Sequence, residues 1–254
     1  MKKLVVILLV LIAIGACLPV GTAKAQEYKV AKSSGRLELH LGRVTVEGHS
    51  GNEIIFTSRN NDKDNDPRAE GLTSINSLGL KDNTGLGLNV TEKGDVVSVY
   101  NLKKNNSPDV KILVPKGIIV LFEHQGVGGG DADFRNLDNE IEVSVQYNSV
   151  NLENVSGPLT IRSIYGHVEA TLNANVKDPI SIVSIYGYVD VTLPGTSKAN
   201  LRLDTSYGEI LVDPKFKIDF DSSGDGDRVA GKLNGGGVNI DLTCNYGKVY
   251  LRQK

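Results

Sequence analysis

Five tyrosines recur in the C-terminal half of the chain, and a row of such side chains could bind a ligand. They are Tyr147, Tyr165, Tyr186, Tyr207 and Tyr246. Rings that point outward could stack on sugars or on a partner's aromatic groups, whereas rings that point inward would form a ladder within the core. The tyrosines share the parity of aliphatic residues six and four positions before them. We therefore expect the inward, structural ladder, with ligand binding as the alternative.

The tyrosines are spaced by 18, 21, 21 and 39 residues. A period near 20 is typical of repeat architectures in which each copy stacks on its neighbour. Apolar residues alternate on both sides of each tyrosine, which predicts two strands per copy with one buried face. We expect a corner with positive φ at the glycine that follows four of the tyrosines. These corner glycines are Gly166, Gly187, Gly208 and Gly247, with Asn148 in the equivalent place of the first copy.

The pattern predicts an all-β chain: a single elongated β-solenoid of stacked rungs over residues 26–254. Residues 116–254 hold the regular rungs, interrupted by an inserted loop or hairpin at 214–237. Residues 26–115 form a less regular β region, in which strands are expected at 37–48, 53–58, 86–92, 95–102 and 110–115. Residues 59–71 read as a polar loop.

Residues of the opposite parity are expected to face outward and to include an apolar strip. The strip consists of Ile164, Val183, Ile185 and Tyr188. An exposed apolar strip can mark a partner surface. It can also lie beneath the inserted segment or be the ordinary apolar share of a protein surface.

No residue cluster predicts a catalytic or metal site, and we expect no cofactor. Asp62, Asp64 and Asp66 resemble the start of a calcium loop, but Pro67 stands where glycine is needed and Thr73 where glutamate is needed. The segment 126–134 is better interpreted as a turn than as a calcium-binding repeat. The other weak candidates are scattered or isolated: His40, His49, His124, His167, Asp219, Asp221, Asp225, Asp227 and Cys244, the last expected to be a buried thiol.

The N-terminal 25 residues have the pattern of a secretory signal peptide. Lys2 and Lys3 precede a long apolar run, and Ala23 and Ala25 supply the small residues of a cleavage site before Gln26. In the alternative interpretation Cys17 is the lipidated residue of a lipoprotein. No other stretch of the sequence is apolar enough to span a bilayer.

Charge and cysteine content narrow the possible partners. Removal of residues 1–25 takes away three lysines and no acids, which leaves 25 basic against 30 acidic residues, a net charge of −5. This balance argues against nucleic acid or anionic lipid as the partner, since both need a basic face. Cys244 is then the only thiol, so an internal disulfide is excluded.

The chain resembles the adhesin-like domain family of bacterial envelope proteins, over most of residues 37–254. The resemblance rests on Val114, Pro115 and Gly117, on the glycine-rich turn at 126–130, on the run at 136–170 and on the later Tyr-Gly rungs. It implies export and a stacked β fold, and it brings no catalytic residues. The insertion at 214–237 departs from the family pattern.

Three functions are compatible with these features. The leading one is an exported, non-catalytic binding or adhesion module in the periplasm or on the surface of a Gram-negative cell, with a glycan or an envelope protein as its partner. The second is a periplasmic scaffold that docks through the Ile164 and Ile185 face. The third, a polysaccharide-degrading β-helix enzyme, needs clustered carboxylates that this sequence does not display on one face.

Overall fold

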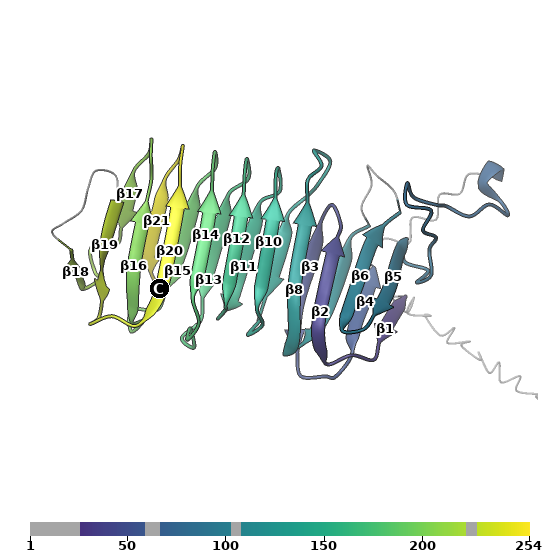
Figure 1. The fold of residues 1–254 in the computed structure, drawn as a ribbon, viewed down its shortest axis with the longest axis horizontal. Helices are drawn as coiled ribbons and strands as arrows, with labels where there is room; N and C mark the ends of the chain where they lie inside the picture. Colours follow the sequence, from purple (N-terminus) through teal and green to yellow (C-terminus); the bar gives the residue numbers. More distant parts are fainter. Residues whose placement is uncertain (1–25, 59–66, 103–107, 222–227) are drawn as a thin grey trace, which may run out of the picture.

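The computed structural model describes residues 26–58, 67–102, 108–221 and 228–254. They form an elongated solenoid of two long β-sheets, one behind the other in Figure 1. The sheets contain ten and eleven strands, and the only helical segment among the described residues is a 3-10 turn at Pro67–Ala69. The all-β solenoid predicted from the repeat is therefore confirmed.

Each regular rung places one strand in each sheet, joined by a short corner. Strands of neighbouring rungs pair in parallel, residue for residue, so that Ile161 lies beside Val143 on one side and Ile182 on the other. The rungs comprise β8 (Gly117–His124) with β9 (Ala132–Arg135), β10 (Ile141–Val145) with β11 (Val150–Val155), β12 (Leu159–Ser163) with β13 (Val168–Leu172), and β14 (Ile180–Ser184) with β15 (Val189–Leu193).

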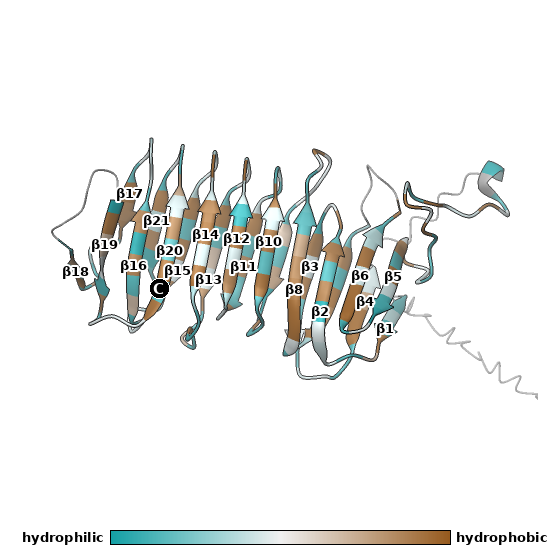
Figure 2. Ribbon diagram, viewed as in Figure 1, coloured by the Kyte–Doolittle hydropathy of each residue, from teal (hydrophilic) through white to brown (hydrophobic). Residues whose placement is uncertain are grey.

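The core is a continuous stack of aliphatic side chains between the two sheets. Strands such as β10, β12 and β14 alternate strictly between buried and solvent-facing positions. Figure 2 shows the same alternation as bands of contrasting hydropathy along the strands. One rung alone buries too little apolar surface to offset its chain entropy, so the stack as a whole provides the stability.

The rungs at the C-terminal end do not follow sequence order. After β15 the chain forms β16 (Ala199–Asp204) and β17 (Ile210–Val212), and later β20 (Val238–Cys244) and β21 (Val249–Gln253). β20 lies between β14 and β16, and β21 lies between β15 and β17. The last rung in the sequence is therefore the last but one in space, which the sequential stacking expected from the repeat did not include.

The segment predicted as an insertion forms a hairpin at the C-terminal end of the stack. It consists of β18 (Ile218–Phe220) and β19 (Arg228–Leu233), and β19 pairs antiparallel with β16. Antiparallel pairing ends the parallel stack and covers an edge that would otherwise accept another strand. Of the two alternatives expected for 214–237, a loop or a hairpin, the described residues form the hairpin.

The N-terminal end has the same kind of threading. β2 (Ser34–His40) and β3 (Val44–His49) lie between β8 and β9 on one side and β6 (Val96–Asn101) and β7 (Val110–Pro115) on the other. Antiparallel strands close this end: β5 (Leu88–Lys93) against β6, β4 (Ile54–Ser58) against β7, and β1 (Glu27–Val30) against β4. The strands expected in residues 26–115 are all present.

Three sequence interpretations fall wholly or partly on segments outside the described residues. These are the signal segment 1–25 with Cys17, the acidic triplet Asp62, Asp64 and Asp66, and the pair Asp225 and Asp227 of the insertion. Within the described parts of the chain, no helix has the length and hydrophobicity needed to traverse a bilayer.

Candidate functional site

The five repeated tyrosines form one continuous stack on the outside of the solenoid, here named the tyrosine ladder. Their spatial order is Tyr147, Tyr165, Tyr186, Tyr246, Tyr207, with ring centroids 4.9–5.1 Å apart and ring planes within 15° of parallel. The side chains are 46–75% exposed. The ladder predicted from the sequence exists, but its predicted place in the core is wrong.

The change of direction occurs because the strand ends before the tyrosine. β12 ends at Ser163 and β14 at Ser184, two residues before each ring, and the strict inside-outside alternation stops there. The corners still pair with one another, since the amide of Tyr186 donates to the carbonyl of Ile164 and the amide of Tyr246 to that of Ile185. Parallel backbone pairing through the corner therefore holds successive rings one strand spacing apart.

The corner glycines are needed for close approach and not for positive φ. None of the four has positive φ, so that part of the prediction is wrong. A Cβ on Gly187 would overlap the carbonyl oxygen of Gly166, and a Cβ on Gly247 would overlap that of Gly187. The rungs therefore stack at their corners with bare backbone against bare backbone, which only glycine permits.

A small polar residue two positions before each tyrosine fastens the corner, a role that sequence reasoning missed. The hydroxyl of Ser184 lies 3.0 Å from the carbonyl oxygen of Gly166 in the preceding rung and accepts from the amide of Gly187 at 3.1 Å. Ser163 and Thr205 make comparable contacts, and the thiol of Cys244 lies 3.3 Å from the carbonyl oxygen of Gly187. The recurrence of Ser, Ser, Thr and Cys at one place in the repeat was the available signal.

Stacking determines what the tyrosine ladder can offer a ligand. The inner rings are covered on both faces by neighbouring rings, so their faces cannot stack on a sugar. Edges and phenolic hydroxyls remain available, and each hydroxyl can both donate and accept a hydrogen bond. The ladder is thus a row of hydrogen-bonding groups repeated about every 5 Å along the long axis, in register with the strands.

Replacement of Tyr186 by alanine tests the exposed position of the ladder. The change removes two ring contacts, each worth about 0.5–1.5 kcal/mol, and little buried area. We expect the free energy of unfolding, measured by urea denaturation, to fall by about 1–3 kcal/mol. The stacking of Tyr165 on Tyr147 should be retained. Ile182→Ala, at a fully buried position of the same rung, is the matched comparison and should cost more. A larger loss for Tyr186→Ala would contradict the exposed placement.

The four residues of the predicted outward strip do not form one surface. All are partly buried. Val183 lies on the outer side of β14, and Ile164 and Ile185 flank the tyrosine ladder. Tyr188 stacks on His167 and donates to Glu169 of β13, in the other sheet. Desolvation and this hydrogen bond raise the pKa of Tyr188 to about 12.

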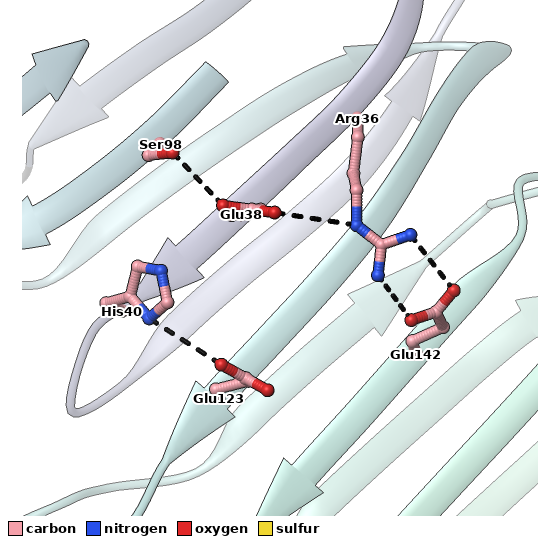
Figure 3. A network of polar contacts seen from close by, with 6 residues as sticks. All are labelled: Arg36, Glu38, His40, Ser98, Glu123 and Glu142. Atoms are coloured by element: carbon pink, nitrogen blue, oxygen red, sulfur yellow. Dashed lines mark hydrogen bonds and ion pairs between the residues drawn. The ribbon is translucent and has the colours of Figure 1, made fainter. Parts of the chain in front are cut away.

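The outer face of the eleven-stranded sheet carries an ion-pair network in the N-terminal part of the solenoid. Figure 3 shows Arg36 of β2 binding Glu142 of β10 with two hydrogen bonds, of 2.5 and 3.2 Å. Glu38 accepts from Ser98, and His40 lies 3.9 Å from Glu123. The bond to Glu142 raises the pKa of Arg36. The Arg36–Glu142 pair reaches across β8, and the other two contacts join neighbouring strands, so the arrangement is that of a surface network.

The other candidates are separate from one another. His124 binds Asn148, whose amide group donates to the carbonyl oxygens of Gly42 and Gly130 and so fills the corner beside the glycine-rich turn. Cys244 is buried, as predicted, and desolvation raises the pKa of its thiol. Across the described ranges, no group of three or more His, Cys, Asp and Glu side chains is placed to hold a metal ion.

Comparison with known proteins finds two solved structures and one family that are similar to parts of this chain. Two solved structures are similar in part: a putative cell adhesion protein from Clostridium sporogenes, with 14% identity, a TM-score of 0.45 and coverage of 91% of this chain and 100% of that one, and a putative adhesin from Bacteroides fragilis, with 9% identity, a TM-score of 0.25 and coverage of 92% and 98%. No curated protein matches this chain. Residues 127–251 match the family described as Toastrack DUF4097, which confirms the resemblance drawn from the sequence over that part. The segment that matches the Toastrack DUF4097 family thus includes all five rings of the tyrosine ladder.

Proposed function

We propose that this protein is an exported, non-catalytic binding module of the bacterial cell envelope, and that the tyrosine ladder is its binding surface. The observation that carries the proposal is the repetition of one exposed side chain on five neighbouring rungs at a constant spacing of 4.9–5.1 Å. A surface that repeats in one dimension suits a partner that repeats in one dimension.

A linear glycan running along the solenoid axis is the partner that fits this chemistry best. The ladder offers phenolic hydroxyls, and the residue before each ring adds amide or hydroxyl groups on three rungs, at Gln146, Ser206 and Asn245. A sugar chain presents hydroxyl groups at every unit, and both sides can donate and accept. Because the inner ring faces are occupied by each other, recognition uses ring edges and hydroxyls.

The test is to replace hydroxyls while leaving the stack in place. In Tyr165→Phe/Tyr186→Phe/Tyr246→Phe the rings remain, but three hydrogen-bonding groups are lost. With about 0.5–1.5 kcal/mol for each lost bond, affinity for purified envelope polysaccharide should fall about tenfold or more. Isothermal titration calorimetry on a panel of acidic and neutral polysaccharides measures this effect.

Tyr100→Phe is the matched control, since Tyr100 stacks on His40 away from the ladder. It should bind the polysaccharide as the unaltered protein does. Equal affinity of the triple variant and the unaltered protein would remove the ladder as the binding site. Shortening of the polysaccharide during the assay would favour the enzyme interpretation instead.

Docking to an envelope protein is the second candidate, and the partial exposure of Ile164 and Ile185 beside the ladder favours it. Both functions require export. Protease digestion of intact and permeabilised cells, with the mature N-terminus identified by mass spectrometry, tests that requirement. Digestion on intact cells supports adhesion at the surface, whereas protection until the outer membrane is opened supports a periplasmic scaffold.

A further inference from the structure

A short hairpin at 75–81 and the residues 72–74 just before it carry a second, separate apolar feature at the N-terminal end of the solenoid, and the two together are here named the hairpin tip. Leu72, Ile75 and Leu78 are 75%, 59% and 66% exposed. Outside the tyrosine ladder, the described residues include three other exposed large apolar side chains, and they lie elsewhere in the sequence: Val127, Leu211 and Phe220. In Figure 1 this loop follows the 3-10 turn and projects beyond the right-hand end of the sheets.

Several backbone groups between Asn76 and Leu80 are paired within the hairpin. The side-chain oxygen of Asn76 accepts from the amides of Leu78 and Leu80, and the carbonyl of Asn76 accepts from the amide of Gly79. The amide of Asn76 donates to the carbonyl of Leu80, and Ile75 forms a bridge with Lys81. Backbone groups that are paired within a segment can leave water at little cost, which an apolar environment requires.

The base of the hairpin is fixed to the solenoid. Asn89 of β5 donates to the carbonyl of Lys81 at 2.7 Å, and the carboxylate of Asp82 accepts from the amides of Thr84, Gly85 and Gly87. Leu86 and Leu88, just beyond, are buried in the core. The three exposed aliphatic side chains therefore belong to a segment that is anchored to the solenoid at its base.

The N-terminal segment leaves the solenoid at the same place. A Cβ on Gly85 would overlap the side-chain amide of Gln26, so residue 26 lies against the base of the hairpin. The 25 residues before it include the apolar run that begins at Leu4. If Cys17 is lipidated, the nine residues from Cys17 to Gln26 reach at most about 30 Å, so this end of the solenoid stays near the lipid.

We propose that the hairpin tip with Leu72, Ile75 and Leu78 inserts into the headgroup region of a lipid bilayer and holds the N-terminal end of the solenoid against the membrane. The net charge of the described residues next to the tip is zero, because two are basic and two are acidic: Arg68, Lys81, Glu70 and Asp82. Insertion therefore depends on apolar burial and not on attraction to anionic lipid, in agreement with the acidic net charge. An interfacial apolar group of this kind lies ~5–10 Å into the headgroup boundary.

The chain contains no tryptophan, so a single introduced tryptophan reports its own surroundings. Leu78→Trp places the reporter at the tip, and Val127→Trp places it at an aliphatic position that is 80% exposed in the corner between β8 and β9. The full protein, expressed with its own leader, is mixed with phosphatidylcholine vesicles whose lipids carry bromine near the top of the acyl chains. Emission spectra are then compared.

We expect the Leu78→Trp emission to shift to shorter wavelength and to be quenched by the brominated lipid, and the Val127→Trp emission to change little. Adding Leu72→Ser and Ile75→Ser to Leu78→Trp should abolish the quenching, whereas Tyr-to-Phe changes in the ladder should leave it intact. Absence of vesicle binding, or equal quenching at both positions, overturns the proposal. A shift that appears without vesicles and grows with protein concentration would assign the hairpin to a second copy and would also overturn it.

Discussion

Gly247→Ala is expected to destabilise the protein by about 3 kcal/mol or more, near or above the upper end of ordinary overpacking effects. The new methyl group would overlap the carbonyl oxygen of Gly187, which belongs to backbone in the neighbouring rung. Backbone cannot rotate away as a side chain can, so relief requires separation of the two corners. Separation would weaken the backbone pairing through the corner and the contacts of Tyr246 with Tyr186 and Tyr207.

Gly128→Ala is the matched control, since a Cβ there meets nothing within 4 Å and the residue has no positive φ. Its unfolding midpoint in urea should equal that of the unaltered protein. The destabilisation in Gly247→Ala should appear as a lower midpoint with an unchanged slope. Equal midpoints for the two variants would show that the corners can separate freely and that the close approach of glycines is not required.

The repeat could be predicted because stacking imposes one environment on every copy. Ile161, Ile182 and Leu242 occupy the same buried place on neighbouring strands, and each position accepts only an aliphatic side chain of similar size. Alternation and period therefore survive in the sequence. The two-strand rung, the hairpin insertion and the buried Cys244 all followed from that regularity.

The direction of the tyrosines could not be predicted from parity alone. Side chains alternate between the inside and the outside only while the chain is extended, and the extended strands end at Ser163 and Ser184. The small polar residue two positions before each tyrosine forms a hydrogen bond that closes the turn. The sequence predicts the corner glycine for its ability to adopt positive φ. Glycine is required instead because a Cβ at that position would overlap the backbone of the neighbouring rung.

The order of the rungs was beyond the sequence for a different reason. Side chains that fit one rung fit any rung, so the apolar pattern cannot distinguish β20 beside β14 from β16 beside β14. The long interval of 39 residues between Tyr207 and Tyr246 was the only sign of irregularity. It marks an excursion: β16 to β19 form the end of the stack, and the chain then returns to insert β20 and β21 beneath them.

This threading leads to the second large effect, the removal of residues 238–254. In an ordinary solenoid, a terminal deletion shortens the stack by one rung. Here it removes an internal rung, so β16 loses its partner β20 and β17 loses its partner β21. Four buried aliphatic residues are lost, Ile240, Leu242, Val249 and Leu251, which together contribute about 6–12 kcal/mol. This is comparable to the net stability of a whole domain.

Removal of residues 199–237 is the control, and it should be tolerated better although it is the larger deletion. It takes away the excursion as a unit and places Val238 where Ala199 stood, since those residues pair in register. It also leaves 21 residues between Tyr186 and Tyr246, the spacing of Tyr165 and Tyr186. Hydrogen exchange should show protected amides in β14, β15, β20 and β21 of this variant.

In the variant without residues 238–254, hydrogen exchange should show β16 to β19 unprotected and β14 and β15 weakened as a newly exposed edge. The reverse ranking, with the shorter deletion more stable than the longer one, would mean that β16 and β17 can move inward and pair directly with β14 and β15. In the native threading β19 occupies the outer edge of β16, and the inner edge of β16 is the one that pairs with β20.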